Sequence, residues 1–227
     1  MEVKEKEENK IMPKFILGKK IGLTHIFDQE GNFIPVTVIE AGPCLVTQIK
    51  SKDKDGYYAI QLAFGEKKKV NKPQTGHLKK FLKNKEEIKK FARYLKEFKI
   101  NEKEMEKISI KEGNYIKVDV LKEGELVDVV GFTKGRGFQG VIKRHGFQRG
   151  PTSHGSDHHR EPGSIGSMFP QRVVKGRKLP GRMGVRRVTV KNLKVVKIEP
   201  EKNIICLSGP VPGPKNNLVL IRNNRYE

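Results

Sequence analysis

Three glycines in the middle of the chain have the spacing of a nucleotide-binding loop. Gly135, Gly137 and Gly140 spell G-x-G-x-x-G directly after the strand-like sequence VDVVGF. In dinucleotide-binding enzymes such glycines let the backbone approach a pyrophosphate, and an acidic residue about twenty positions further on binds the ribose. Glu161 lies at about that distance, but in the turn-like sequence HREPGS, and no alternation of strands and helices surrounds the motif. We therefore expect no nucleotide cofactor, and instead a backbone that lies beside phosphates and leads into a short helix over residues 138–144.

The stretch HGSDHH, residues 154–159, brings together the donor types of a metal site. Imidazole and carboxylate groups bind zinc, but zinc sites usually draw their ligands from two separated clusters, and this chain has no second cluster. The nearby Ser153 and Ser164 add hydroxyls, yet no G-x-S-x-G turn and almost no carboxylates accompany them. We predict neither a metal site nor a catalytic site here, and expect His154 and His158 to contact phosphate or base.

Positive charge dominates the segment that contains both motifs. Residues 131–187 hold thirteen Lys or Arg against two acids, Asp157 and Glu161, so a formal +11 of the chain's net +21 lies within 57 residues. Twelve glycines are interspersed, and apolar residues are too sparse for a core. Such a segment cannot fold by burying surface, and it needs a polyanion to neutralise its charge. The composition therefore indicates a nucleic-acid partner.

Composition argues against a membrane partner and against secretion. No run approaches the roughly 18 apolar residues of a membrane span. The first twenty residues lack the apolar core of a signal peptide, and no Trp- or Leu-rich amphipathic helix accompanies the charge. Cys44 and Cys206 are isolated thiols in apolar, strand-like sequences, which is typical of buried cysteines rather than of a disulfide framework. We expect a cytosolic protein.

Most of the elements that must position the basic segment have strand patterns. Residues 14–64 contain FILGKKIGLTHIF, FIPVTVIEA, LVTQIKS and YYAIQLAF, separated in part by the turn clusters DQEGN and KDKDG. Strand patterns return at residues 115–133 and, after the basic segment, in VRRVTVKNLKVVKIEP, NIICLSG and LVLIR. Tight polar turns between strands predict an antiparallel sheet that closes into a small barrel. The basic segment is then a long connection between two strands, far above the usual loop length.

One stretch between the strand patterns has helical spacing instead. Ile88, Phe91, Leu95 and Phe98 recur at intervals of three and four residues, with Lys and Glu between them. This spacing predicts one amphipathic helix, preceded by a short helix at residues 77–82.

The predicted fold class is mainly β with minor α: an antiparallel β-barrel with a long basic loop and a small helical insertion. The predicted parts are a disordered tail at 1–12, a barrel at 13–133 and 185–222 with the helical insertion at about 75–108, an extended loop at 134–184, and a tail at 223–227. Within the loop, Phe138 and Phe147 are expected to pack at its base. For Phe169, packing and stacking on a base both remain open.

The chain resembles the bacterial large-subunit ribosomal protein L-three family. The resemblance runs from GKKIGLTHIFDQEGNFIPVTVIEAGPCLVTQIK through VDVVGFTKGRGFQGVIKRHGF and SHGSDHHREPGSIGS to RVVKGRKLPGRMGVRRVTVKNLKVVKI and LSGPVPGPKNN. It covers nearly all of residues 13–222, and the block at residues 163–184 is highly specific for the family.

The resemblance implies a structural protein of the ribosome, not an enzyme, with no cofactor and no small-molecule substrate. Family members bind 23S rRNA near its 3′ end, act early in large-subunit assembly, and have a barrel of the type shared with translation factors. Their loop, which matches residues 134–187 here, reaches towards the peptidyl-transferase centre, with residues 164–172 near the innermost tip. The resemblance also implies neighbouring proteins of the L-fourteen and L-nineteen families, and a place on the cytoplasmic ribosome.

The residues expected to contact rRNA are the loop's cations together with histidines, a serine and glycines. Arg suits bidentate contact with phosphate, Lys acts as a point charge, and Gly lets the chain turn inside crowded RNA. The predicted rRNA-binding residues are Lys134, Arg136, Lys143, Arg144, Arg149, His154, His158, Arg160, Gly163, Ser164, Gly166, Arg172, Lys175, Arg177, Lys178, Arg182, Arg186 and Arg187.

Overall fold

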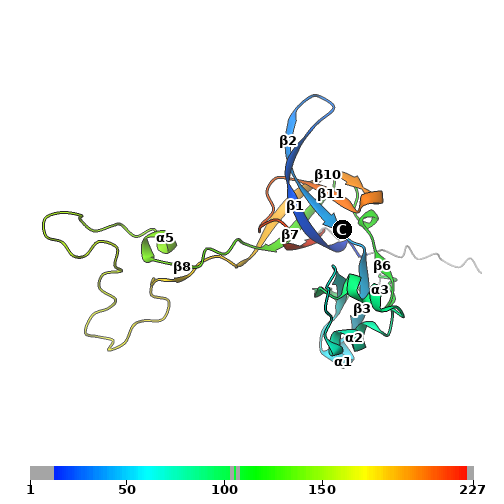
Figure 1. The fold of residues 1–227 in the computed structure, drawn as a ribbon, viewed down its shortest axis with the longest axis horizontal. Helices are drawn as coiled ribbons and strands as arrows, with labels where there is room; N and C mark the ends of the chain where they lie inside the picture. The colour runs from blue at the N-terminus through cyan, green and yellow to red at the C-terminus, as the bar shows by residue number, and fades with distance from the viewer. Residues whose placement is uncertain (1–12, 103–104, 106–107, 224–227) are drawn as a thin grey trace, which may run out of the picture. The chain divides into compact units, whose positions relative to one another are not determined.

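The structure, a computed structural model, describes residues 13–102, 105 and 108–223. The predicted tails at 1–12 and 223–227 lie outside the described residues except for Asn223, as do four positions of the predicted helical insertion. The chain divides into two units (Figure 1). Unit 1 is built from the residues up to Gly131 and from Val188 onward, and unit 2 is Phe132–Arg187.

Six strands form a closed barrel, in the order β1–β12–β7–β10–β11–β2 (Figure 1). The strands are β1 (Phe15–Phe27), β2 (Phe33–Ala41), β7 (Leu126–Phe132), β10 (Arg187–Glu199), β11 (Ile204–Ser208) and β12 (Leu218–Arg222). β1 pairs antiparallel with β2 and β12, β11 with β2 and β10, and β12 with β7. The predicted antiparallel β-barrel is confirmed.

Aliphatic side chains fill the interior of unit 1. Ile16, Ile39, Val129, Leu207 and Ile221 come from five different barrel strands, and all are fully buried in one hydrophobic cluster. Closure gives every barrel strand two neighbours and leaves no open edge along the paired residues. Such a core is an independent scaffold, and it includes no residue of unit 2.

The predicted strands LVTQIKS and YYAIQLAF do form, but their assignment to the barrel is wrong. They are β3 (Cys44–Lys50) and β4 (Ala59–Phe64), and they lie in a second sheet of order β5–β4–β3–β6 with β5 (Tyr94–Lys99) and β6 (Tyr115–Ile116). The reason is that β11 already pairs with the second edge of β2 and closes the barrel there. Gly42, with φ of +78°, turns the chain out of β2 before β3 begins.

The predicted single amphipathic helix is also wrong, because its second half is a strand. The chain forms α2 (Lys72–Leu78) and α3 (Lys85–Phe91), and then β5, which pairs with β4. Leu95 and Phe98 are three residues apart, so on a strand they lie on opposite faces. Phe98 belongs to the main core cluster and stacks on Phe15 at 4.3 Å, whereas Leu95 packs against a second cluster with α3. The three-residue spacing of Leu95 and Phe98 would place both side chains on one face of a helix, but on this strand it sends them into two different cores.

The remaining elements are short. They are α1 (Lys52–Asp55), η1 (Val118–Val120), η2 (Pro200–Lys202) and, in unit 2, β8 (Phe138–Gln139), α5 (Val141–His145) and β9 (Gly181–Arg182). The turn that contains η2 joins β10 to β11. Both cysteines are free and buried, as predicted, and burial raises the pKa of the Cys44 thiol to about 12.

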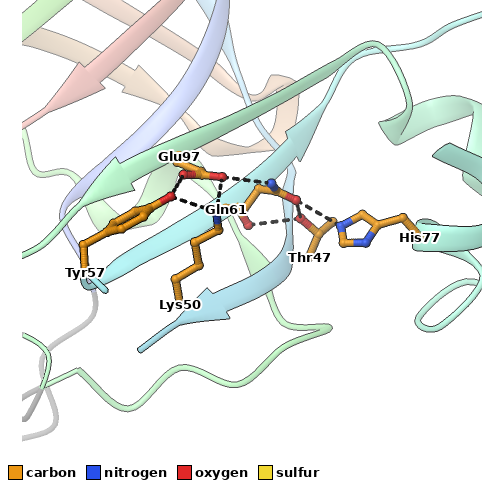
Figure 2. Close-up of polar contacts among 6 residues, drawn as sticks. All are labelled: Thr47, Lys50, Tyr57, Gln61, His77 and Glu97. Atoms are coloured by element: carbon orange, nitrogen blue, oxygen red, sulfur yellow. Dashed lines mark hydrogen bonds and ion pairs between the residues drawn. The ribbon is translucent and has the colours of Figure 1, made fainter. Parts of the chain in front are cut away.

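Polar side chains on the second sheet form a connected network (Figure 2). Lys50 Nζ donates a hydrogen bond to Tyr57 Oη at 2.8 Å and pairs with Glu97 Oε1 at 3.0 Å. Tyr57 Oη donates to Glu97 Oε2 at 2.9 Å, and the Lys50 ammonium also lies 5.1 Å from the centre of the Tyr57 ring. Burial alone would raise the pKa of Glu97, but the hydrogen bonds from Lys50 and Tyr57 outweigh it and lower that pKa. The carboxylate is thus held in its charged form.

The same network reaches helix α2 through an amide. Gln61 Nε2 donates to Glu97 Oε1 at 3.3 Å, and its Oε1 accepts from Thr47 Oγ1 at 2.8 Å and lies 3.0 Å from His77 Nε2 (Figure 2). Strands β3, β4 and β5 and helix α2 are thereby joined by side chains. We infer that this network stabilises the second sheet.

Replacing Glu97 with Gln is expected to lower the free energy of unfolding by about 1 kcal/mol at neutral pH. The pKa of Glu97 is lowered in the folded state, so the carboxylate stabilises the fold above its unfolded pKa, and this contribution is lost as the pH falls through the folded pKa. Urea unfolding of wild type and E97Q at pH 7 and at about pH 3 measures the difference, which should shrink at the lower pH. The control is Glu201→Gln on the exposed η2, which should change neither value. A destabilisation by E97Q that is equal at both pH values would contradict this role.

Candidate nucleic-acid interface

Unit 2 begins and ends as a hydrogen-bonded ribbon. Thr133 N donates to Arg186 O at 3.0 Å, and Arg186 N donates to Thr133 Oγ1 at 3.1 Å. Arg136 N donates to Met183 O at 2.9 Å, and Met183 N donates to Gly137 O at 2.9 Å. The antiparallel pair β8–β9 continues the ribbon. The outgoing and returning chains are therefore held side by side at the base of unit 2.

Gly184 makes this close approach possible. Gly184 has φ of +85°, and a Cβ there would overlap the carbonyl oxygen of Lys134. A Cβ at Gly181 would overlap the guanidinium of Arg144. In the G-x-G-x-x-G motif only Gly137 has positive φ (+68°), and the motif lies along the ribbon, where Gly140 is the N-cap of α5. Gly184 thus serves the packing of two backbone segments, whereas Gly181 leaves room for the side chain of Arg144.

Helix α5 fastens the two ends of the long connecting segment, residues 147–178. Arg144 Nη1 donates to Leu179 O at 2.7 Å, and His145 Nε2 lies 3.0 Å from the same oxygen. Arg144 is half-buried, and its Nε is buried without a hydrogen-bond partner among the described residues. Among the predicted rRNA-binding cations, Arg144 is the half-buried one, and its side chain binds the protein's own backbone at Leu179. The predicted helix at 138–144 exists, but it is shifted, because Phe138 and Gln139 pair with β9.

The connecting segment has no helix and no strand among residues 147–178, and nearly all of its residues are exposed. Two of the three histidines of HGSDHH, His158 and His159, have separate partners. His158 Nδ1 lies 3.1 Å from Glu161 Oε2, and His159 Nδ1 lies 2.8 Å from Pro151 O. The part of the chain that the structure describes contains no group of three His, Cys, Asp or Glu placed to hold a metal ion. The cluster therefore does not converge on a common point.

Three predicted residues meet further along the segment. Arg177 Nη2 donates to Ser164 O at 2.5 Å, and Ser164 Oγ donates to Gly166 O at 3.0 Å. This contact brings together positions that are 13 residues apart. The guanidinium of Arg177 otherwise remains exposed, so it has donors left for an anion.

Cations of unit 2 lack acidic partners. Within the described residues, none of the thirteen Lys and Arg side chains of unit 2 forms an ion pair with a carboxylate. All but Arg144 are exposed, and among the residues that the structure describes, only Arg144 and Arg177 of these cations donate side-chain hydrogen bonds to the protein. By contrast, Lys14, Lys19, Lys50, Lys197 and Lys202 of unit 1 are all paired with glutamates. Unit 2 thus presents a concentration of positive charge that an external polyanion would neutralise.

Apolar side chains accompany these cations. Phe138 is 72% exposed, so its predicted packing at the base of the loop is wrong, whereas Phe147 is half-buried with its ring 6.1 Å from that of His145. Phe169 is 72% exposed and Met168 is 76% exposed. The sequence reasoning missed Met168, although an apolar residue within a coreless basic segment is itself a signal. Exposed rings beside cations are suited to stacking on bases.

No helix among the described residues combines the length and apolar character needed to span a membrane.

Comparison with known proteins identifies similar sequences. Residues 106–203 match the family model described as "Ribosomal protein L3". The protein named "Large ribosomal subunit protein uL3" from Pelotomaculum thermopropionicum is 54% identical over 214 residues, which cover 93% of this chain and 97% of the relative. Proteins of the same name from Carboxydothermus hydrogenoformans (53% identical, covering 93% of this chain and 97% of the relative) and Herpetosiphon aurantiacus (53%, covering 91% and 94%) are also similar.

Proposed function

Because this chain belongs to the uL3 family of large ribosomal subunit proteins, we propose that it binds 23S rRNA directly, chiefly through unit 2. The chain is a structural constituent of the large ribosomal subunit. The observation that carries the proposal is the set of thirteen Lys and Arg in unit 2 that lack carboxylate partners among the described residues. Placing that many cations together is costly unless a polyanion neutralises them.

We propose that the exposed cations among the predicted residues contact the rRNA, and that Arg144 supports them by its hydrogen bond within unit 2. The exposed Lys and Arg neutralise phosphates that would repel one another as rRNA segments compact. The hydrogen bond of Arg144 to Leu179 O fixes the base from which the connecting segment extends. His154, His158, Ser164 and the glycines of the segment let it follow the RNA closely.

The family resemblance supports further details of the same proposal. The rRNA site lies near the 3′ end of 23S rRNA, binding there helps to nucleate early subunit assembly, and residues 134–184 extend towards the peptidyl-transferase centre. The neighbours are proteins of the L-fourteen and L-nineteen families. The role is structural, without catalysis by this chain.

The test is a crosslinking map of the full chain on RNA. The chain is bound to a 3′ fragment of 23S rRNA and irradiated with ultraviolet light, and the crosslinked peptides are identified by mass spectrometry. Crosslinks are expected within residues 134–187, and a 5′ fragment of equal length, as the matched control, should compete weakly. Crosslinks confined to unit 1 would contradict the proposal, and equal competition by heparin and by both fragments would indicate a general polyanion binder instead.

A further inference from the structure

The β1–β2 hairpin continues beyond the rest of the barrel (Figure 1). β12 pairs with β1 over Phe15–Lys19, and β11 pairs with β2 from Val36 to Glu40. Further out, β1 and β2 pair with each other as far as Phe27 and Phe33. The outer part is therefore a two-stranded ribbon, an arrangement that is at best marginally stable in water without a third layer.

One face of this ribbon is apolar and exposed. The register sets His25 opposite Pro35 and Phe27 opposite Phe33, and Leu23 lies two residues before His25, so all five residues share a face. Leu23 is 64% exposed, Phe27 64% and Phe33 61%. Large apolar side chains gathered in this way, rather than scattered singly, mark an interaction surface.

The rings on this face are already arranged as a cluster. His25 stacks on Phe33 with ring centres 4.8 Å apart, and meets Phe27 edge-on at 5.5 Å. Phe27 and Phe33 are 6.3 Å apart in an edge-to-face arrangement. Binding of a partner here costs little side-chain entropy in the hairpin, because the rings already hold one another in place.

The charge of the hairpin distinguishes it from unit 2. The chain has 47 Lys and Arg in 227 residues, yet none lies between residues 21 and 49. The hairpin turn carries Asp28 and Glu30 instead. Sites that stack nucleic-acid bases on aromatic rings combine those rings with a positive groove that follows the phosphates. The hairpin combines its rings with negative charge from Asp28 and Glu30, which favours a basic polypeptide as the partner and disfavours RNA.

We propose that the hairpin face formed by Leu23, His25, Phe27, Phe33 and Pro35 docks a basic protein of the large subunit. Apolar side chains of that neighbour pack among the rings, and its Lys or Arg side chains lie beside Asp28 and Glu30. The proposal rests on the chain's place in the large subunit, but it does not depend on how unit 2 binds rRNA.

The test places the photocrosslinker p-benzoylphenylalanine at Phe27 of the full chain and, in a second variant, at Phe33. Both positions are exposed, so the aromatic replacement leaves the fold intact. Large subunits that contain the variant are isolated from the cells and irradiated, and the crosslinked product is digested and sequenced. A crosslink to a ribosomal protein of net positive charge is expected at both positions. A crosslink to rRNA or to a second copy of this chain, or no protein crosslink, would overturn the proposal.

Two controls separate the possible outcomes. The same probe at Phe138 of unit 2, which is 72% exposed, should crosslink to rRNA, so a failure at the hairpin is distinguishable from a failure of rRNA binding. The double change Asp28→Lys and Glu30→Lys should reduce the yield of the protein crosslink at Phe27 by at least about tenfold, because it sets like charges against each other. Glu201→Lys, an exposed change on η2, should leave that yield unaltered.

Discussion

Deletion of residues 147–178 is expected to lower affinity for the 3′ fragment of 23S rRNA by at least about 10³-fold at about 0.1 M salt. The deletion removes Arg149, Arg160, Arg172, Lys175, Arg177 and Lys178. Each cation that neutralises a phosphate releases condensed counterions, and the entropy of that release favours binding. Equilibrium binding of the two purified chains to the same fragment, by filter retention or fluorescence anisotropy, measures the ratio of dissociation constants.

The structure makes this deletion practicable. Arg144 and His145 both contact the carbonyl oxygen of Leu179, so the two cut ends lie close together, and a Gly-Ser-Gly linker can join Gly146 to Leu179. No residue of the deleted segment belongs to either core cluster, so the melting temperature should be that of the full chain. A variant that melts normally and binds within tenfold of the full chain would show that the segment is not the main contact.

Replacement of Gly184 with Ala is expected to break the ribbon at the base of unit 2 and to lower rRNA affinity at least about tenfold, equivalent to about 1.4 kcal/mol. Gly184 has φ of +85°, and its Cβ would overlap the Lys134 carbonyl oxygen, an atom of the backbone that cannot swing aside. The two chains of the ribbon must then separate, and the hydrogen bonds that join Arg136, Gly137 and Met183 are lost. Amide hydrogen exchange at Arg136 and Met183 measures that loss directly.

Gly176 provides a matched control for this change. It has the same φ of +85°, but a Cβ there has no atom within 4 Å. Gly176→Ala therefore imposes the same left-handed strain, about 1–2 kcal/mol, without the overlap. It should leave protection of Arg136 and Met183 intact. Equal loss of protection in the two variants would mean that backbone strain, and not close packing of the ribbon, explains the effect.

The barrel follows from the sequence because each of its strands has a clear pattern and clear turns. The second sheet does not, because the pattern of β3 and β4 is the same whether they pair within the barrel or apart from it. What decides is that β11, more than 160 residues further along, takes the free edge of β2. The strand β5 could not be predicted from the sequence, for a related reason. Leu95 and Phe98 serve two different cores, and sequence spacing cannot distinguish two cores from one helix face.

The charged surface of unit 2 is predictable because it depends on composition. With two acids in unit 2, at least eleven of its thirteen cations cannot pair with a carboxylate of the same unit. Individual roles are less predictable, since Arg144 is identical in type to its exposed neighbours and differs from them through its burial and its contact with Leu179. The exposure of Phe138 likewise depends on the pairing of β8 with β9, which no local pattern indicates.

The central claim, that the cations of unit 2 hold rRNA phosphates, is tested most directly by paired salt titrations. The logarithm of the binding constant for the 3′ fragment of 23S rRNA is plotted against the logarithm of salt concentration for the full chain and for the chain that lacks residues 147–178. Each neutralised phosphate contributes about −0.7 to −0.9 to the slope, so the six cations removed should make the full chain's slope steeper by about 4 to 5. Equal slopes for the two chains would contradict the claim.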